Sequence, residues 1–139
     1  MRITLESDYA LRIIYALAKH DEIVDAKTIS AETSVTLQFT LKILHKLVQY
    51  DFVKSYKGTR GGYCLGIPPE KITLKDVIER IDGPIAMVRC LENSESCNLN
   101  QEKTACIFHH IFDIISLDVA RKLESITISD VLNKTYLIK

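Results

Sequence analysis

Along the first fifty residues, apolar side chains recur every three or four positions, which is the spacing of helices with a buried face. Ser7 is placed to cap the first of these helices. The second helix is short, and only the turn Thr33-Ser34 separates it from the third. The pattern therefore predicts three helices, at residues 8–19, 26–32 and 36–50.

The apolar pattern changes to a period of two after residue 51. Residues 52–56, Phe-Val-Lys-Ser-Tyr, are interpreted as a short strand, a glycine-rich turn occupies 57–62, and residues 63–65 form a second short strand. This arrangement predicts a β-hairpin. A short helix, a tight turn, a longer helix and then a hairpin is the order of a winged helix–turn–helix domain, which places its longer helix in the major groove of DNA.

The remainder of the chain is predicted to be helical except for one polar segment. Residues 85–104 have no clear period and are expected to form a loop, and no internal repeat is apparent. Thr73 is placed to cap the helix before this loop, and Asp82-Gly83-Pro84 ends that helix. The helices expected here cover residues 74–81, about 104–123 and a short stretch within 125–132.

The last long helix carries a broad apolar face: Ile107, Phe108, Ile111, Phe112, Ile115, Val119 and Leu123. The domain before it has residues for its own core, so we expect this face to cover a second copy in a two-fold homodimer. The alternative is that it packs back on its own domain. The fold class is thus mainly α with a small β-hairpin. It divides into a winged helix–turn–helix domain (1–83), a cysteine-bearing sensor loop (84–104), and a dimerisation helix with a C-terminal tail (105–139).

The predicted recognition helix, 36–50, gathers its polar side chains on one arc of roughly 100°. Apolar residues flank this arc on both sides, so we expect most of the helix to be buried, with Phe39, Leu44 and Leu47 in the core. Glutamine can bond base edges, and lysine and histidine can reach phosphate or guanine. An ordinary solvated face is the alternative. The polar residues of the arc are Gln38, Lys42, His45, Lys46 and Gln49.

The charge distribution favours the nucleic-acid interpretation. The 18 basic and 18 acidic residues cancel, which excludes binding through bulk charge but allows a local basic patch. Between Gln38 and Arg60 there are five Lys or Arg residues and one acid, Asp51. The glycine-rich turn has no bulk to keep it from a minor groove or a phosphate. The predicted contacts to duplex DNA are Thr36, Gln38, Lys42, His45, Lys46, Gln49, Lys57, Thr59 and Arg60.

Several function classes are excluded by the sequence. No apolar run approaches the ~20 residues that cross a bilayer, and no signal peptide is apparent, so we expect a cytoplasmic protein without a membrane partner. There is no nucleophile with a base and orienting group, no phosphate-cradling loop and no pair of carboxylates in a cleft. We therefore expect neither an enzyme nor a protein substrate.

Three of the four cysteines lie within 17 residues, as Cys90, Cys97 and Cys106. The C-x2-C pairs of zinc ribbons are absent. Three thiolates with one more ligand can hold an iron–sulfur cluster. His109 lies on the same helical arc as Cys106, so an imidazole ligand is available. The spacing alone leaves an iron–sulfur cluster, a zinc site and a thiol switch open.

These features together resemble the Rrf-two family of winged-helix regulators, typified by IscR and NsrR, over nearly the whole chain. The three spaced cysteines after a wing are the most specific part of the resemblance. The other segments that carry it are Met1-Arg2-Ile3-Thr4, Asp8-Tyr9-Ala10-Leu11-Arg12, Phe52-Val53-Lys54-Ser55, Gly61-Gly62-Tyr63-Cys64-Leu65, Ile72-Thr73-Leu74-Lys75-Asp76-Val77-Ile78, Asp82-Gly83-Pro84 and Ser125-Ile126-Thr127-Ile128-Ser129-Asp130-Val131-Leu132.

The resemblance implies a homodimeric transcription regulator, expected to be a repressor, whose operator affinity depends on a 2Fe–2S or 4Fe–4S cluster. The alternative is a regulator of the same fold that uses a zinc site or a cysteine thiol switch, or that works without a metal. By position, the three clustered cysteines match the cluster ligands. The fourth ligand is His109 in the IscR-like branch or Asp8 of the other subunit in the NsrR-like branch. The cysteine spacings are longer than in either branch. Leu41 stands where the IscR-like branch has an acidic base-reading residue, so that operator preference is not carried over.

Overall fold

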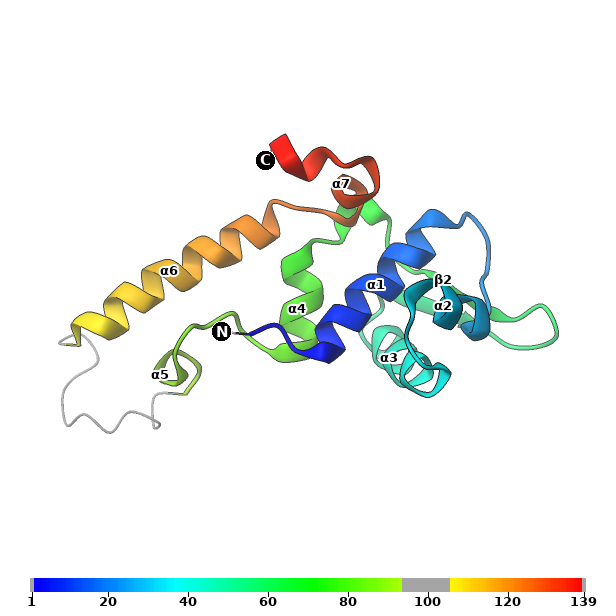
Figure 1. Ribbon diagram of the computed structural model, residues 1–139, viewed down its shortest axis with the longest axis horizontal. Coiled ribbons are helices and arrows are strands. Elements are labelled where there is room, and N and C mark those ends of the chain that lie inside the picture. Colours follow the sequence, from blue (N-terminus) through cyan, green and yellow to red (C-terminus); the bar gives the residue numbers. More distant parts are fainter. Residues whose placement is uncertain (1, 94–105, 139) are drawn as a thin grey trace.

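The computed structural model describes residues 2–93 and 106–138. It is mainly helical with one two-stranded antiparallel sheet, which confirms the expected fold class (Figure 1). A short helix, α5, lies in the segment that was expected to be a loop throughout. The elements are α1 (Leu5–Lys19), α2 (Ala26–Thr33), α3 (Leu37–Gln49), β1 (Val53–Tyr56), β2 (Gly62–Leu65), η1 (Pro69–Lys71), α4 (Leu74–Asp82), α5 (Arg89–Glu92), α6 (Ile107–Glu124), α7 (Ile128–Asn133) and η4 (Thr135–Ile138).

Helix α1 begins earlier than the sequence predicted. Thr4 caps it, because its hydroxyl oxygen accepts a hydrogen bond from the backbone N–H of Ser7 at 3.2 Å. Ser7 is buried inside the helix instead of capping it, so that prediction was wrong. The earlier start brings Leu5 and Glu6 into the first helical turn.

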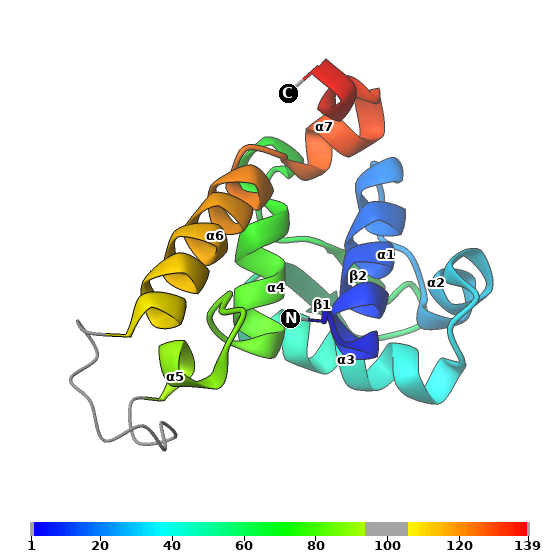
Figure 2. The same cartoon turned by 60° about the vertical axis from the view of Figure 1, so that its left-hand side comes forward.

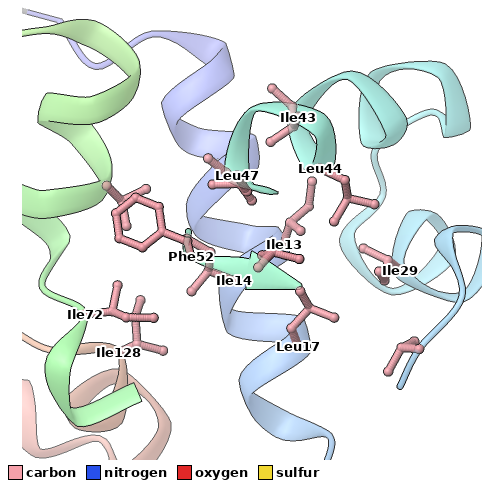
Figure 3. Close-up of a cluster of buried hydrophobic side chains, with 14 residues drawn as sticks. Ile13, Ile14, Leu17, Ile29, Ile43, Leu44, Leu47, Phe52, Ile72 and Ile128 are labelled. Carbon is pink, nitrogen blue, oxygen red and sulfur yellow. The ribbon is translucent and has the colours of Figure 1, made fainter. Parts of the chain in front are cut away.

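The hydrophobic core surrounds α1 (Figure 3). Helices α2, α3, α4 and α7 and strand β2 all contact α1. Burying a large aliphatic side chain contributes about 1.5–3 kcal/mol, so the side chains packed around α1 are a major source of stability. The core side chains labelled in Figure 3 are Ile13, Ile14, Leu17, Ile29, Ile43, Leu44, Leu47, Phe52, Ile72 and Ile128.

The hairpin forms the wing, with Val53 opposite Leu65 in an antiparallel register. Val24 forms an isolated β-bridge to strand β2: Val24 and Tyr63 exchange two backbone hydrogen bonds of 2.9 and 2.8 Å. Gly62 is required here, because its φ is +154° and a Cβ would lie 2.5 Å from the carbonyl oxygen of Val24. The wing is thereby attached to the start of the helix–turn–helix.

Residues 72–78 and 126–132 are a short internal repeat, ITLKDVI and ITISDVL, which the sequence analysis missed. Each copy opens a helix, α4 or α7, with a Thr–Asp capping box. The two repeats pair with each other within the chain through backbone hydrogen bonds. The N–H of Leu74 donates to the carbonyl oxygen of Ile126 at 3.0 Å, and the N–H of Ile128 donates to the carbonyl oxygen of Ile72 at 2.8 Å. This pairing returns the chain to α4 and places Ile128 in the core around α1.

Helix α6 lies beside α4 (Figure 2). It begins at Ile107, directly after Cys106, and ends at Glu124. Among the described helices, none has the length and apolar character needed to cross a membrane.

Burial in α3 makes a prediction about stability. Replacing the fully buried Leu47 by alanine is expected to lower the free energy of unfolding by ~2–5 kcal/mol, because a cavity remains. Phe39→Ala should cost clearly less, since Phe39 is 40% exposed and was wrongly expected in the core. Urea denaturation followed by circular dichroism measures both. An equal loss of stability at the two positions would contradict the surface position of Phe39.

Candidate nucleic-acid interface

Helix α3 is held against the core by one face only. Its buried side chains are Thr40, Ile43, Leu44 and Leu47. Thr36 caps the helix by accepting a hydrogen bond from the N–H of Phe39 at 3.3 Å. Ser34, in a left-handed conformation with φ of 57°, ends α2 and makes the turn to α3 tight. The remaining surface of α3 is therefore presented to solvent in a fixed orientation.

The outward face of α3 is wider and more apolar than the sequence predicted. Leu37, Phe39 and Leu41 are all exposed, Leu41 by 44%, although both apolar flanks were expected to be buried. A single helix at the edge of a small domain has core on one side only, so the second flank stays at the surface. An exposed leucine in this position can contact a thymine methyl group. The predicted polar residues Thr36, Gln38, Lys42, His45 and Gln49 are exposed, and Lys46 is half-buried.

Phe39 owes its surface position to aromatic contacts with α1. Its ring packs edge-on against Tyr9, with centroids 5.8 Å apart. The Lys42 ammonium lies 5.6 Å from the centroid of the same ring, and the Arg12 guanidinium lies 5.5 Å from that of Tyr9. The N-terminal part of α3 is thus held against α1 by the contact between Phe39 and Tyr9. A cation-π contact, from Lys42 or Arg12, adds to each ring.

Glu6 is a residue of this surface that sequence reasoning missed. One of its carboxylate oxygens accepts a hydrogen bond from the Lys42 ammonium at 2.8 Å, and the other accepts from Lys46. These hydrogen bonds, first from Lys42 and then from Lys46, hold the pKa of the Glu6 carboxyl below its usual value. Glu6 is therefore ionised at neutral pH. Its partners are 36 and 40 residues away, so no local pattern could have indicated them.

The wing turn, residues 57–61, is tight and carries free cations. The N–H of Gly61 donates to the carbonyl of Gly58 at 3.0 Å, and a Cβ on Gly61 would lie 2.3 Å from the carbonyl oxygen of Tyr56. Lys57, Thr59 and Arg60 are exposed. Within the described part of the chain, neither Lys57 nor Arg60 has an ion-pair partner, in contrast to the lysines of α3.

The cysteine region brings α5 and α6 together. The thiol of Cys90 lies 3.3 Å from Nδ1 of His109, and both side chains are half-buried. Cys106 immediately precedes α6, and Cys97 lies outside the described residues. Asp8 pairs with Arg12 at 2.6 Å. Among residues 2–93 and 106–138, no three His, Cys, Asp or Glu side chains converge on one metal position.

One side of helix α6 contacts α4 and α5, and the other side is exposed to solvent. The Ser116 hydroxyl donates to the carbonyl of Phe112 at 2.7 Å and accepts from the N–H of Met87 at 3.0 Å. Ile107 and Phe108 are 72% and 70% exposed. Ile114 and Leu117, which the sequence analysis did not include, are exposed as well, whereas Phe112, Val119 and Leu123 are half-buried.

Residues 3–134 match the model of a family described as Rrf2, iron-dependent transcriptional regulator. The HTH-type transcriptional regulator NsrR of Bacillus subtilis is 27% identical over 142 residues, covering 100% of this chain and 96% of NsrR. Among solved structures, CymR, the global cysteine regulator of B. subtilis, has a TM-score of 0.79 at 26% identity, covering 96% of this chain and 98% of CymR.

A second solved structure, T. potens IscR, has the same fold, with a TM-score of 0.75 at 21% identity over 97% of this chain and 88% of that one. Winged-helix proteins therefore match the described fold over almost its full length. The relatives are transcription regulators and not enzymes. With the family model matching nearly every residue, the chain belongs to the Rrf2 family and is an HTH-type, DNA-binding transcription regulator.

Proposed function

We propose that this protein is a cytoplasmic homodimer that binds an operator duplex through α3 and the wing turn, acting as a repressor. The observation that carries the proposal is the outward face of α3, whose other face is held in the core, beside Lys57 and Arg60 of the wing turn, which have no ion-pair partner among the residues that the structure describes. Gln38, His45 and Gln49 are placed to bond base edges in the major groove. The wing cations would follow the phosphates or enter the minor groove.

The bare side of α6 supports the homodimer. A monomer would leave the exposed isoleucines and Phe108 of this helix in water, at a cost that grows with the apolar area. A second copy of α6 covers the face with identical residues, as two-fold symmetry requires. The two α3 helices would then reach half-sites about one turn of DNA apart.

We further propose that an iron–sulfur cluster, held by Cys90, Cys97 and Cys106, sets the operator affinity. The donor set fits such a group, because thiolates and imidazoles are the ligands that clusters use. His109 is already within 3.3 Å of Cys90, which favours it as fourth ligand. Asp8 of the other subunit remains the alternative, but it would have to release Arg12. A bound cluster supplies a group sensitive to electron transfer and to small reactive molecules.

A bound cluster would affect DNA binding through contacts within this chain. Cys90 lies on α5, and Ser116 ties the segment before α5 to the middle of α6. Ligation at Cys90 and Cys106 would therefore fix the distance between α5 and the start of α6. Since α6 is the proposed dimer contact, that distance sets the relative position of the two recognition helices.

A second candidate is the same regulator with a zinc site or a thiol switch in place of the cluster. The contact between the Cys90 thiol and the His109 imidazole suits either of them. Metal and sulfide analysis separates these possibilities.

For DNA binding, Arg60→Ala is expected to weaken operator affinity about fivefold, as an exposed charge contact contributes about 1 kcal/mol. The log–log dependence of affinity on salt should become shallower by about 0.9, because the variant neutralises one phosphate fewer. Lys71→Ala is the matched control, since Lys71 lies on η1 against α7 and outside the proposed interface. Fluorescence anisotropy with an operator selected from random duplexes measures both. An equal decrease of affinity in both variants would contradict the proposed role of the wing.

For the cluster, protein purified without oxygen is expected to contain iron and acid-labile sulfide, and Cys90→Ala should lose both. Cys64→Ala, on the wing strand β2, is the matched control and should retain them. His109→Ala and Asp8→Ala distinguish the two fourth ligands. Colourless, iron-free protein after anaerobic reconstitution would rule out the cluster, and bound zinc or a redox-dependent thiol count would then support the second candidate.

For the dimer, Ile111→Glu combined with Ile114→Glu is expected to give a monomer, because two charges would be buried at the shared face. Light scattering on a sizing column measures the mass, and circular dichroism checks the helical content. Ile23→Glu changes another exposed isoleucine, between α1 and α2, and should stay dimeric. A wild-type monomer would refute the proposed assembly.

A further inference from the structure

We propose that Glu6 limits the affinity of the recognition helix for DNA of unmatched sequence. In the free protein, its carboxylate occupies two lysine ammonium groups of α3 that a phosphate would otherwise bind. This inference rests on the proposed function, in which α3 faces the duplex. Glu6 would be a residue of α1 that weakens DNA binding, whereas the proposed contact residues of α3 and the wing strengthen it.

The geometry of the cluster carries the argument. Lys42 and Lys46 are one helical turn apart, so their ammonium groups point to the same side of α3. Glu6 lies opposite them in the first turn of α1, and each of its oxygens accepts a hydrogen bond from one lysine. A carboxylate with two acceptor oxygens thus occupies the position that two oxygens of a phosphate would take.

The cluster is open enough to be entered. Lys42 is 54% exposed at its side chain and Glu6 is 28% exposed, so a phosphate can approach the same ammonium groups. Each ammonium has three donors and can share one with a phosphate. A phosphate bound in this way would stand next to the Glu6 carboxylate, and the two like charges repel each other. Glu6 therefore weakens each phosphate contact made here.

The wing turn provides the contrast within the same molecule. Lys57 and Arg60 have no ion-pair partner among the described residues, so their full charge is available to any duplex. Binding without sequence preference comes almost entirely from phosphate contacts, whereas base contacts give preference. The Glu6 carboxylate reduces the affinity that α3 gains from phosphate contacts. DNA binding by α3 would then depend more on the base contacts of Gln38 and His45.

The test compares Glu6→Gln with the wild-type dimer. On a duplex of random sequence, Glu6→Gln is expected to bind five- to tenfold more tightly, with a log–log salt slope steeper by about 0.9–1.8 for one or two added phosphates. Affinity for the operator should rise less, so the ratio of operator to random affinity falls. The matched control is Glu124→Gln. It also removes a carboxylate that is paired with a lysine, Lys75 at 3.4 Å, but this pair lies at the end of α6.

A mutant cycle gives a second readout. Lys42→Gln should weaken random-duplex binding only slightly in the wild type, where Glu6 already occupies this lysine, and more strongly in the Glu6→Gln background. Unchanged or weaker random-duplex binding by Glu6→Gln would overturn the inference, as would an equal increase of affinity in Glu124→Gln. Failure of the wild-type protein to bind any duplex would overturn the proposed function and this inference together, whereas wild-type binding without a gain in Glu6→Gln would overturn this inference alone.

Discussion

The structure depends on the burial of a single helix, α1, at the centre of the fold. Helices α2, α3, α4 and α7 and strand β2 pack on it, and Ile13 and Ile14 are fully buried. Because the recognition helix, the wing and the returning C-terminal segment share this one support, their relative positions are set by the same contacts. The charged end of α1 also reaches the surface of α3. The helix at the centre of the core therefore also places a carboxylate, that of Glu6, against Lys42 and Lys46 of α3.

The sequence was sufficient for the types of the longer elements, because their signals are local, but the four-residue helix α5 was not predicted. Apolar spacing identified the helices and the hairpin, and capping residues located most ends to within a few positions. The error at α1 has a clear cause: Thr4 and Ser7 are both good caps, and the choice between them depends on Ser7 being enclosed by the core. The repeated heptapeptide was missed because two of its seven positions carry only similar residues and one differs outright, over too short a length to stand out.

The site was less predictable than the fold, because its chemistry depends on contacts between distant residues. Apolar side chains occur around much of α3, and periodicity does not say which flank faces the core, so Phe39 was misplaced. Glu6 reaches α3 across 36 residues. The cysteine spacing indicated that Cys106 and His109 share a helical face, whereas the contact observed is between His109 and Cys90 of a different helix. Residue types could be predicted from the sequence, but their partners could not.

The two ends of α6 are held differently, because the backbone pairing between residues 72–74 and 126–128 lies next to one end only. Its C-terminal end is followed at once by the segment that hydrogen-bonds to the start of α4, while its other end follows the cysteines. Eighteen residues of helix span about 27 Å at 1.5 Å per residue. The helix is therefore a connector of fixed length between the paired segment that follows it and Cys106, and Ser116 holds its middle against Met87. The position of Cys106 relative to the core is set across this whole length.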